Sequence, residues 1–205
     1  MPTITAIYGS PRRSGNTATL LKHAVVGARS AGAVVDEIVL RDQRISPCME
    51  LYACKKGGNC AINDDFTAVR DRLLSADAIM IASPIFFYSV SAHTKTLMDR
   101  CQSLWVKKNW SAAGAGRASP TIKNALFISA GATQGKKLFD GALLTARYFL
   151  DVLDARLWRT LLVRGVDLYG DIYKHPEHLT AAYQAGRDLA TAAAIGPRRQ
   201  PSPAS

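Results

Sequence analysis

The stretch from Gly9 to Thr17 constrains the fold of this chain most strongly, because it joins an apolar run to a helical pattern. Residues 3–8 have the composition of a buried strand, and an Ala- and Leu-rich periodic stretch follows at about residues 16–31. In such a unit, the free N–H groups of the helix N-terminus and the positive end of the helix dipole attract an anion. The stretch therefore predicts a phosphate site, with short polar donors at Ser10, Ser14, Asn16 and Thr17.

The make-up of the loop narrows the kind of phosphate that it would bind. A nucleotide-hydrolase loop would place Lys directly after Gly15, and a dinucleotide-binding loop would need three glycines at fixed spacing. Neither pattern is present. A hydroxyl-rich loop without a metal-binding pattern suits a terminal phosphate monoester, such as that of FMN. The alternative interpretation is a plain strand-to-helix turn in which Ser14 or Asn16 caps the helix.

Length and charge limit the class of protein. A chain of 205 residues suits one domain with a buried core, which we place at residues 1–195, before a tail at 196–205 that we expect to be disordered. The net charge is +10 but the basic residues are scattered, so we expect a surface that attracts anionic cofactors and no nucleic-acid partner. No apolar run could span a bilayer and no signal-peptide pattern is present. We therefore predict a cytoplasmic protein with no membrane partner.

Apolar runs and helical patterns alternate along the chain. We expect strands at residues 3–8, 34–40, 78–82, 125–129 and 156–166. We expect helices at about residues 16–31, 64–74, 91–104, 137–153 and 177–194, and a loop at 105–121. The second helix should bury Phe66, Val69, Leu73 and Leu74 on one face. The alternation predicts an α/β fold, a parallel sheet with helices on both faces, in which the loops after the first, third and fourth strands share one ligand site.

Two of these loops are unusual in sequence. The loop after the third strand contains three consecutive aromatic residues, Phe86, Phe87 and Tyr88, which are costly to expose and too crowded to bury completely. A flat heteroaromatic ligand would explain them, and the alternative is an aromatic core cluster against the following helix. The loop after the fourth strand, residues 130–135, is nearly free of bulk and would let its backbone approach a ring closely. The alternative there is a simple strand-to-helix connection.

Three motifs in this order resemble those of a known family. They are Gly-Ser-Pro-Arg-x-x-x-Asn-Thr from Gly9, Ser-Pro-Ile-Phe-Phe-x-Ser-Val-Ser-Ala from Ser83, and Gly-Ala-Thr-x-Gly-Lys-Lys from Gly131. They are similar to motifs of the flavodoxin-like NAD(P)H-dependent FMN reductases, and in particular of the iron–sulfur flavoproteins, over about residues 4–166. The resemblance implies a doubly wound five-stranded parallel sheet of strand order 2-1-3-4-5 with bound FMN. It also implies a homodimer or a dimer of dimers (a homotetramer), in which partner residues close the flavin site.

The resemblance further implies how the flavin would be held and used. The FMN phosphate would lie at Ser10, Arg12, Ser14, Asn16 and Thr17. The ring would lie along Pro84, Ile85, Phe86 and Phe87, with Gly131, Ala132 and Thr133 on its other side. NAD(P)H would donate a hydride to the flavin, which would reduce a small acceptor such as another flavin or a quinone. We predict no catalytic side chain and expect His93 at the surface. The alternative is an electron carrier between protein partners, similar to the iron–sulfur flavoproteins.

The cysteine stretch departs from this family. Cluster-bearing relatives carry Cys-x2-Cys-x2-Cys-x4–7-Cys, and here Cys48, Cys54 and Cys60 match the first, third and fourth positions. The second position is Leu51, which has no donor atom, so four thiolates for a 4Fe–4S cluster are not available from this stretch. We therefore expect no cluster and predict no metal site, although a three-cysteine cluster with an added fourth ligand would use these cysteines. Cys101 should be a buried core residue.

Overall fold

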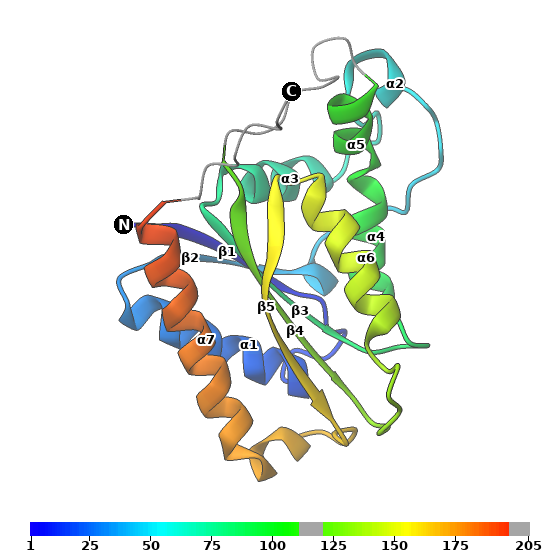
Figure 1. The fold of residues 1–205 in the computed structure, drawn as a ribbon. Helices are drawn as coiled ribbons and strands as arrows, with labels where there is room; N and C mark the ends of the chain where they lie inside the picture. The colour runs from blue at the N-terminus through cyan, green and yellow to red at the C-terminus, as the bar shows by residue number, and fades with distance from the viewer. Residues whose placement is uncertain (111–120, 197–205) are drawn as a thin grey trace, which may run out of the picture.

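A five-stranded parallel sheet forms the centre of the molecule. The computed structural model describes residues 1–110 and 121–196. The strands lie in the order β2-β1-β3-β4-β5, and each neighbouring pair is parallel (Figure 1). They are β1 (Thr3–Tyr8), β2 (Val34–Val39), β3 (Ala78–Pro84), β4 (Lys123–Gly131) and β5 (Ala155–Arg164). The predicted α/β class, the parallel sheet and the strand order are confirmed.

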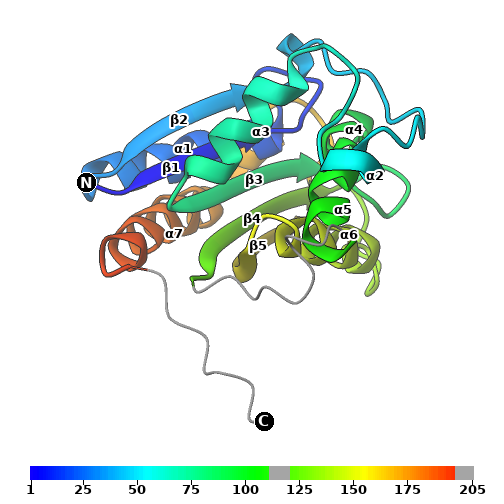
Figure 2. The same ribbon diagram turned by 90° about the horizontal axis from the view of Figure 1, so that it is seen from above.

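Helices cover both faces of this sheet, as predicted (Figure 2). One face carries α1 (Asn16–Ser30) and α7 (Pro176–Ala194), and the other carries α3 (Phe66–Ser75), α4 (Ala92–Arg100) and α6 (Asp140–Asp151). Residues of the central strand β3 alternate between the two cores. Met80 packs with α1 and α7, whereas Ile79 and Ile81 pack with α3, α4 and α6. Burial on both faces explains why this strand is a continuous apolar run in the sequence.

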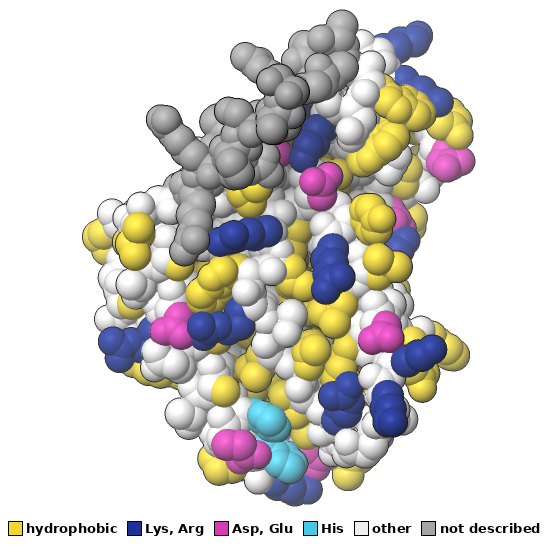
Figure 3. All heavy atoms as spheres, viewed as in Figure 1, with side chains coloured by type: hydrophobic (Ala, Val, Ile, Leu, Met, Phe, Trp, Pro, Cys, Tyr) yellow, Lys and Arg dark blue, Asp and Glu magenta, His cyan; other side chains and the backbone are white. Residues whose placement is uncertain are grey.

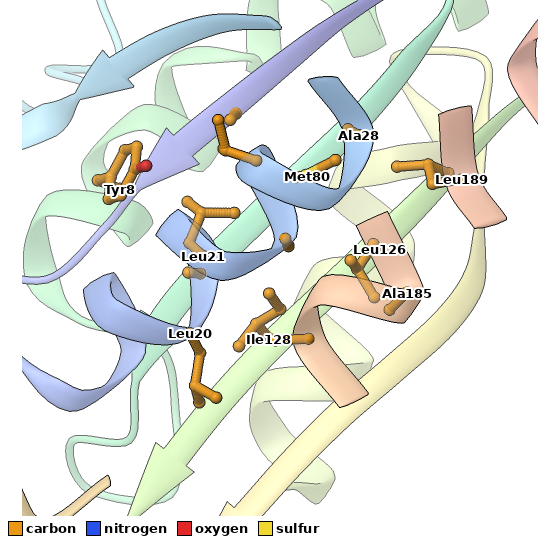
Figure 4. Packing of buried hydrophobic residues seen from close by; sticks show 14 of the residues in the cluster. Tyr8, Leu20, Leu21, Ala28, Met80, Leu126, Ile128, Ala185 and Leu189 are labelled. Atoms are coloured by element: carbon orange, nitrogen blue, oxygen red, sulfur yellow. The ribbon is translucent and has the colours of Figure 1, made fainter. Parts of the chain in front are cut away.

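The helices α1 and α7 cross with their backbones in contact. A Cβ on Gly27 would lie 1.9 Å from the Tyr183 carbonyl oxygen, and a Cβ on Gly186 would lie 1.9 Å from the Ala24 carbonyl oxygen. Only glycine permits so close an approach. Figure 4 shows the apolar side chains of both helices meeting those of β3 and β4 beneath this crossing. The loop at residues 9–15, which leads into α1, is therefore joined to a helix that packs against both the sheet and α7.

The structure corrects the prediction between β3 and β4. The helix expected at 91–104 is two helices, because it is interrupted at Cys101 between α4 and α5 (Gln102–Asn109). The loop expected at 105–121 is wrong at its start, since α5 continues through the buried Val106 to Asn109. The remainder, residues 111–120, lies outside the described residues. Leu74 is also misplaced, because it is 41% exposed, one helical step away from the buried face.

Several boundaries and short elements differ from the prediction. The structure contains the 3₁₀ helices η1 (Leu40–Asp42) and η2 (Asp171–Lys174) and the one-turn helix α2 (Cys54–Gly57). α6 begins at Asp140, because residues 136–139 form turns. The predicted tail lies, from residue 197 on, outside the described part of the chain. Within residues 1–110 and 121–196, no helix combines the length and the apolar character needed to cross a bilayer.

Candidate functional site

The loops after β1, β3 and β4 meet in one cavity of about 210 Å³ beyond the carboxyl ends of these strands. Ser10 and Thr17 line it from the first loop, Ile85 from the second and Ala132 from the third. The strand order explains the meeting, because β3 lies between β1 and β4 and parallel strands end at one edge. The geometry agrees with the prediction that these loops share a site.

The first loop presents unpaired backbone donors at this cavity. Gly15 is the N-cap of α1 and no side chain caps the helix, so the alternative turn capped by Ser14 or Asn16 is wrong. The N–H groups of Asn16 and Thr17 donate no hydrogen bond to any described residue. A Cβ on Gly15 would lie 3.0 Å from Ser10 Oγ, so the loop is tightly closed there. The free donors and the helix dipole favour an anion at this point.

A segment after β5 forms a further wall that the sequence did not indicate. Val166 and Asp167 line the cavity. The amide of Asn16 holds this segment in place, because its Nδ2 donates to the Leu168 carbonyl oxygen at 3.0 Å and its Oδ1 accepts from the Ile172 N–H at 3.3 Å. The side chain of Asn16 is therefore used within the protein, and its backbone N–H remains available. In the sequence, Gly165 and Gly170 are the residues that could have indicated turns in this segment, and both have positive φ in the structure.

Buried hydroxyl groups clamp the ends of the three strands together. Ser91 Oγ donates to the Gly9 carbonyl oxygen at 2.5 Å and accepts from the Thr94 N–H at 3.3 Å as the N-cap of α4. Ser83 Oγ accepts from the Ser91 N–H at 2.9 Å, and Ser129 Oγ donates to the Ser83 carbonyl oxygen at 2.7 Å. These residues are almost completely buried. The network fixes the relative positions of the loops that line the cavity.

The aromatic loop after β3 is a tight turn. The N–H and carbonyl groups of Phe86 and Ser89 exchange two hydrogen bonds of 3.0 Å. Phe87 and Tyr88 between them have φ values of 48° and 60°, as in a type I′ turn, where bulky residues are strained. The exposed fractions of Phe86, Phe87 and Tyr88 are 48%, 101% and 53%. The alternative of an aromatic core cluster is therefore wrong, and Phe87 does not line the cavity.

The structure brings together most of the predicted site residues. Those that line the cavity are Ser10, Arg12, Asn16, Thr17, Pro84, Ile85, Phe86, Gly131 and Ala132. Those that do not line it are Ser14, Phe87 and Thr133. Lining residues that the sequence analysis missed are Pro11, Gly15, Ala130, Val166 and Asp167. His93 is exposed on α4, as expected, and is not part of the lining.

A second cavity, of about 460 Å³, adjoins the cysteine stretch. Cys48, Cys54 and Cys60 all line it, together with Leu51 and Trp110. It shares no lining residue with the cavity at the strand ends. In Figure 1 the neighbouring helices α2 and α5 lie at the top of the view, whereas β4 and β5 end at the bottom. The two cavities are therefore separate sites.

One buried ion pair anchors the cysteine stretch. The Arg100 side chain is fully buried, and its Nη1 lies 2.6 Å from the Asp64 carboxylate and 2.8 Å from the Ser46 carbonyl oxygen. Its Nη2 donates to the Ile62 carbonyl oxygen at 3.3 Å. Although burial opposes ionisation, the hydrogen bonds from Arg100 and from the N–H groups of Ser46 and Phe66 lower the pKa of Asp64. A buried ion pair therefore holds the cysteine stretch against α4.

The donor set at this second cavity does not fit a 4Fe–4S cluster held by four thiolates. Leu51 stands at the second position of the motif, 59% exposed and without a donor atom. The remaining cysteine, Cys101, does not line the cavity, and burial raises the pKa of its thiol to about 12. Among the described residues, no three thiols approach one another within 4.8 Å. Three thiols face this cavity without a fourth.

Comparisons with known proteins agree with the architecture. The profile of the family described as NADPH-dependent FMN reductase matches residues 2–147. An iron–sulfur flavoprotein from Methanocaldococcus jannaschii is 38% identical over 101 residues, which are 49% of this chain and 52% of that protein. Another from Methanosarcina thermophila is 31% identical over 97 residues, 47% of this chain and 51% of that protein. The match spans about half the length of these curated relatives.

Solved structures share the fold at lower identity. An NAD(P)H:quinone oxidoreductase from Methanothermobacter marburgensis has a TM-score of 0.67 at 19% identity, over 92% of this chain and 96% of that chain. An FMN-dependent NADH-azoreductase from Bacillus anthracis, in complex with FMN, has a TM-score of 0.64 at 16% identity, over 95% and 99%. Because the family profile extends over well more than half of the residues, the chain belongs to the NADPH-dependent FMN reductase family.

Proposed function

We propose that this chain binds FMN in the cavity at the strand ends and passes reducing equivalents from NAD(P)H to a small acceptor. The observation that carries the proposal is the pair of unpaired N–H groups of Asn16 and Thr17 at the start of α1. A phosphate monoester placed there would accept both hydrogen bonds and meet the positive end of the helix. Membership of the family supports FMN as the source of that phosphate.

The remainder of the cavity suits a flat ring. Ile85 and Phe86 supply an apolar wall, and Gly131 and Ala132 supply a wall without bulk. A Cβ on Gly131 would lie 3.1 Å from Leu138 Cδ2 and 3.4 Å from Ile85 Cβ, so a larger residue would crowd this wall. Bound FMN would supply the capacity to accept a hydride and to hand electrons on. The role of the protein is to orient the ring against the apolar wall.

Charge at the cavity suits binding more than acid–base chemistry. Arg12 and Asp167 are the only ionisable residues among the described residues that line it. The Arg12 guanidinium would balance the charge of a phosphate, and it already donates to the Asp167 carbonyl oxygen at 3.4 Å. We therefore assign no catalytic side chain, and water would supply any proton that the acceptor needs.

The proposed acceptor is a small planar molecule, such as a quinone or a free flavin. The exposed rings of Phe86, Phe87 and Tyr88, in the turn after β3, would stack on such a molecule. We further propose a cytoplasmic homodimer or dimer of dimers. Leu144 and Tyr148, on the outer side of α6, are 57% and 73% exposed, and a second copy would bury such apolar side chains.

An electron carrier between protein partners is the second candidate function. The three thiols at the second cavity favour it, because several curated relatives of this chain are named iron–sulfur flavoproteins. The missing donor at Leu51 counts against it, since a stable four-iron cluster uses four thiolates. We therefore favour transfer to a small molecule.

Anaerobic reduction of the FMN-loaded protein tests the proposal. We expect NADPH or NADH, added to separate samples, to bleach the flavin absorption within the time of a turnover. Flavin that stays oxidised with both donors but bleaches with dithionite would favour the electron carrier. A purified protein that neither retains nor binds FMN would overturn the proposal as a whole.

The variant Thr17→Val tests the phosphate position, because it removes a hydroxyl group at the cavity and preserves the size of the side chain. We expect the Kd for FMN to rise about tenfold, the equivalent of about 1.4 kcal/mol for one lost hydrogen bond. Quenching of FMN fluorescence measures this constant. Thr191→Val, at an exposed position of α7, is the matched control and should leave it unchanged. Equal affinities of Thr17→Val and the unaltered protein would contradict the assignment.

A further inference from the structure

Two histidines and a glutamate gather at the start of α7, on residues that the flavin cavity does not use. His175 Nδ1 lies 3.4 Å from Glu177 Oε1, and His178 Nε2 lies 3.9 Å from the same oxygen. The three candidate ligand atoms all lie within 4.8 Å of one another. Figure 3 shows histidine side chains beside an acidic group on the surface at the bottom of the view, where α7 begins.

These separations are close to those that a bound metal ion imposes. Bonds of 2.0–2.1 Å to imidazole nitrogen and about 2.0–2.2 Å to carboxylate oxygen place neighbouring ligand atoms of a tetrahedral ion about 3.3 Å apart. Small rotations of the side chains would bring His178 to this distance from Glu177. The backbone beneath them forms a closed turn, because the His178 N–H donates to the carbonyl oxygen of the N-cap residue His175 at 3.0 Å. The three side chains are thus held on one turn of chain.

No positively charged lysine or arginine side chain among the described residues neutralises Glu177. Lys174, the nearest lysine in sequence, is paired with Asp171 at 2.8 Å. Within the described residues, Glu177 has no lysine or arginine within ion-pair distance, and its partners are the two histidines. In the described part of the chain, the carboxylate therefore has no permanent counter-charge.

We propose that His175, Glu177 and His178 bind a divalent transition-metal ion of the zinc class. Two imidazoles and one carboxylate are donors that suit zinc and its neighbours in the series, whereas magnesium and calcium prefer all-oxygen sites. The side chains are 42%, 63% and 33% exposed, so water completes the coordination. The site follows η2, which the Asn16 amide joins to the phosphate loop. A bound ion would therefore stiffen the outer wall of the flavin cavity.

Proton NMR of the histidine rings in the full chain provides a direct test, with Zn²⁺ as the probe after treatment with a chelator. The chain has four histidines, and we expect the ring signals of two to shift as Zn²⁺ is added. His175→Asn and His178→Asn should each remove one of the shifting signals. His23→Asn and His93→Asn are the matched controls, and each should remove a signal that does not shift. Zn²⁺ bound by cysteines would leave these ring signals in place, so the second cavity does not confuse the result.

Calorimetry with Zn²⁺, after alkylation of the accessible cysteine thiols, measures the affinity of the same site. We expect Glu177→Gln and His178→Asn to raise its Kd at least tenfold, and His93→Asn to leave it unchanged. These side chains are partly or fully exposed, so the variants should fold, which their melting temperatures in the presence of chelator would verify. The proposal is overturned if none of the ring signals shifts, if all four shift alike, or if the Glu177→Gln and His178→Asn variants bind Zn²⁺ as the unaltered protein does. The result does not depend on whether FMN is the cofactor.

Discussion

The two cavities of this molecule are held in different ways. At the strand ends, the buried hydroxyl groups of Ser83, Ser91 and Ser129 join three strands through neutral hydrogen bonds. At the cysteine stretch, the pair of Arg100 and Asp64 supplies the buried anchor. Loss of one neutral hydrogen bond from a network lowers the free energy of unfolding modestly. Loss of one partner of a buried ion pair lowers it more, because the other charge stays buried without a counter-charge. The cavity at the strand ends should therefore tolerate substitution better than the cysteine stretch.

The variant Leu51→Cys should produce the largest change, because it supplies the donor that the cysteine cavity lacks. After anaerobic treatment with iron and sulfide, we expect it to retain about four iron atoms per chain, as a cluster with four thiolates does. The unaltered protein and the control Leu51→Ser should lose their iron to a chelator. Iron and sulfide assays measure the difference. A chain with Leu51 that held four irons as firmly would show that three thiolates suffice.

The variant Asp64→Asn should have the largest effect on stability. It leaves the buried Arg100 guanidinium without its counter-charge, and we expect a loss of about 3 kcal/mol in the free energy of unfolding. Unfolding in urea measures this value. Asp99→Asn is the matched control, because Asp99 pairs with Lys95 while both side chains are about half exposed, and it should cost less than about 0.5 kcal/mol. A similar small loss for Asp64→Asn would show that the ion pair isn't the anchor.

The same ion pair predicts how stability depends on pH. Because the pKa of Asp64 is lowered in the folded protein, its contribution is complete above the unfolded value of about 3.9 and is lost as pH falls through the folded pKa. The unaltered protein should therefore lose more stability than Asp64→Asn as the pH falls from about 5 to below 3. Parallel losses in the two proteins would assign the acid sensitivity to other carboxylates.

The fold could be predicted because its signals are local. The apolar run of β3, the glycine-bounded loop before α1 and the alternation of elements each lie within a few residues of sequence. The outer wall of the cavity could not be predicted in this way. It depends on hydrogen bonds from Asn16 to Leu168 and Ile172, which are more than 150 residues away in the chain. No local pattern records a pairing over that distance, so the role of the Asn16 side chain was missed.

The position of Phe87 shows the same limit at short range. Its aromatic neighbours and the resemblance both predict that the Phe87 side chain lies against the flavin ring. The structure instead places it at the tip of a turn with positive φ, fully exposed. A sequence pattern indicates that an aromatic residue is present, but the backbone conformation decides where its side chain points.

The variant Ser91→Ala tests the neutral network and should cost less than Asp64→Asn. It removes the helix cap of α4 and leaves the Gly9 carbonyl oxygen without its donor, and we expect a loss of about 2 kcal/mol. Ser75→Ala is the control, since Ser75 is exposed and donates only to the Arg72 carbonyl oxygen. Urea unfolding compares the two. A loss above that of Asp64→Asn would reverse the comparison between the cavities.

The variant Phe87→Gly should have the smallest effect on stability and separates strain from function. Relief of the positive φ, about 1–2 kcal/mol, is opposed by about 1 kcal/mol from the greater freedom of glycine in the unfolded chain. We expect a net gain of about 0.5 kcal/mol in the free energy of unfolding, with a higher KM for a quinone acceptor. Phe87→Leu is the matched control, because it retains the strain and removes the ring, so it should raise KM without stabilising the fold. If both variants keep the original KM, the turn holds Phe87 outside the path of the acceptor, and the exposed ring plays no part in the reaction.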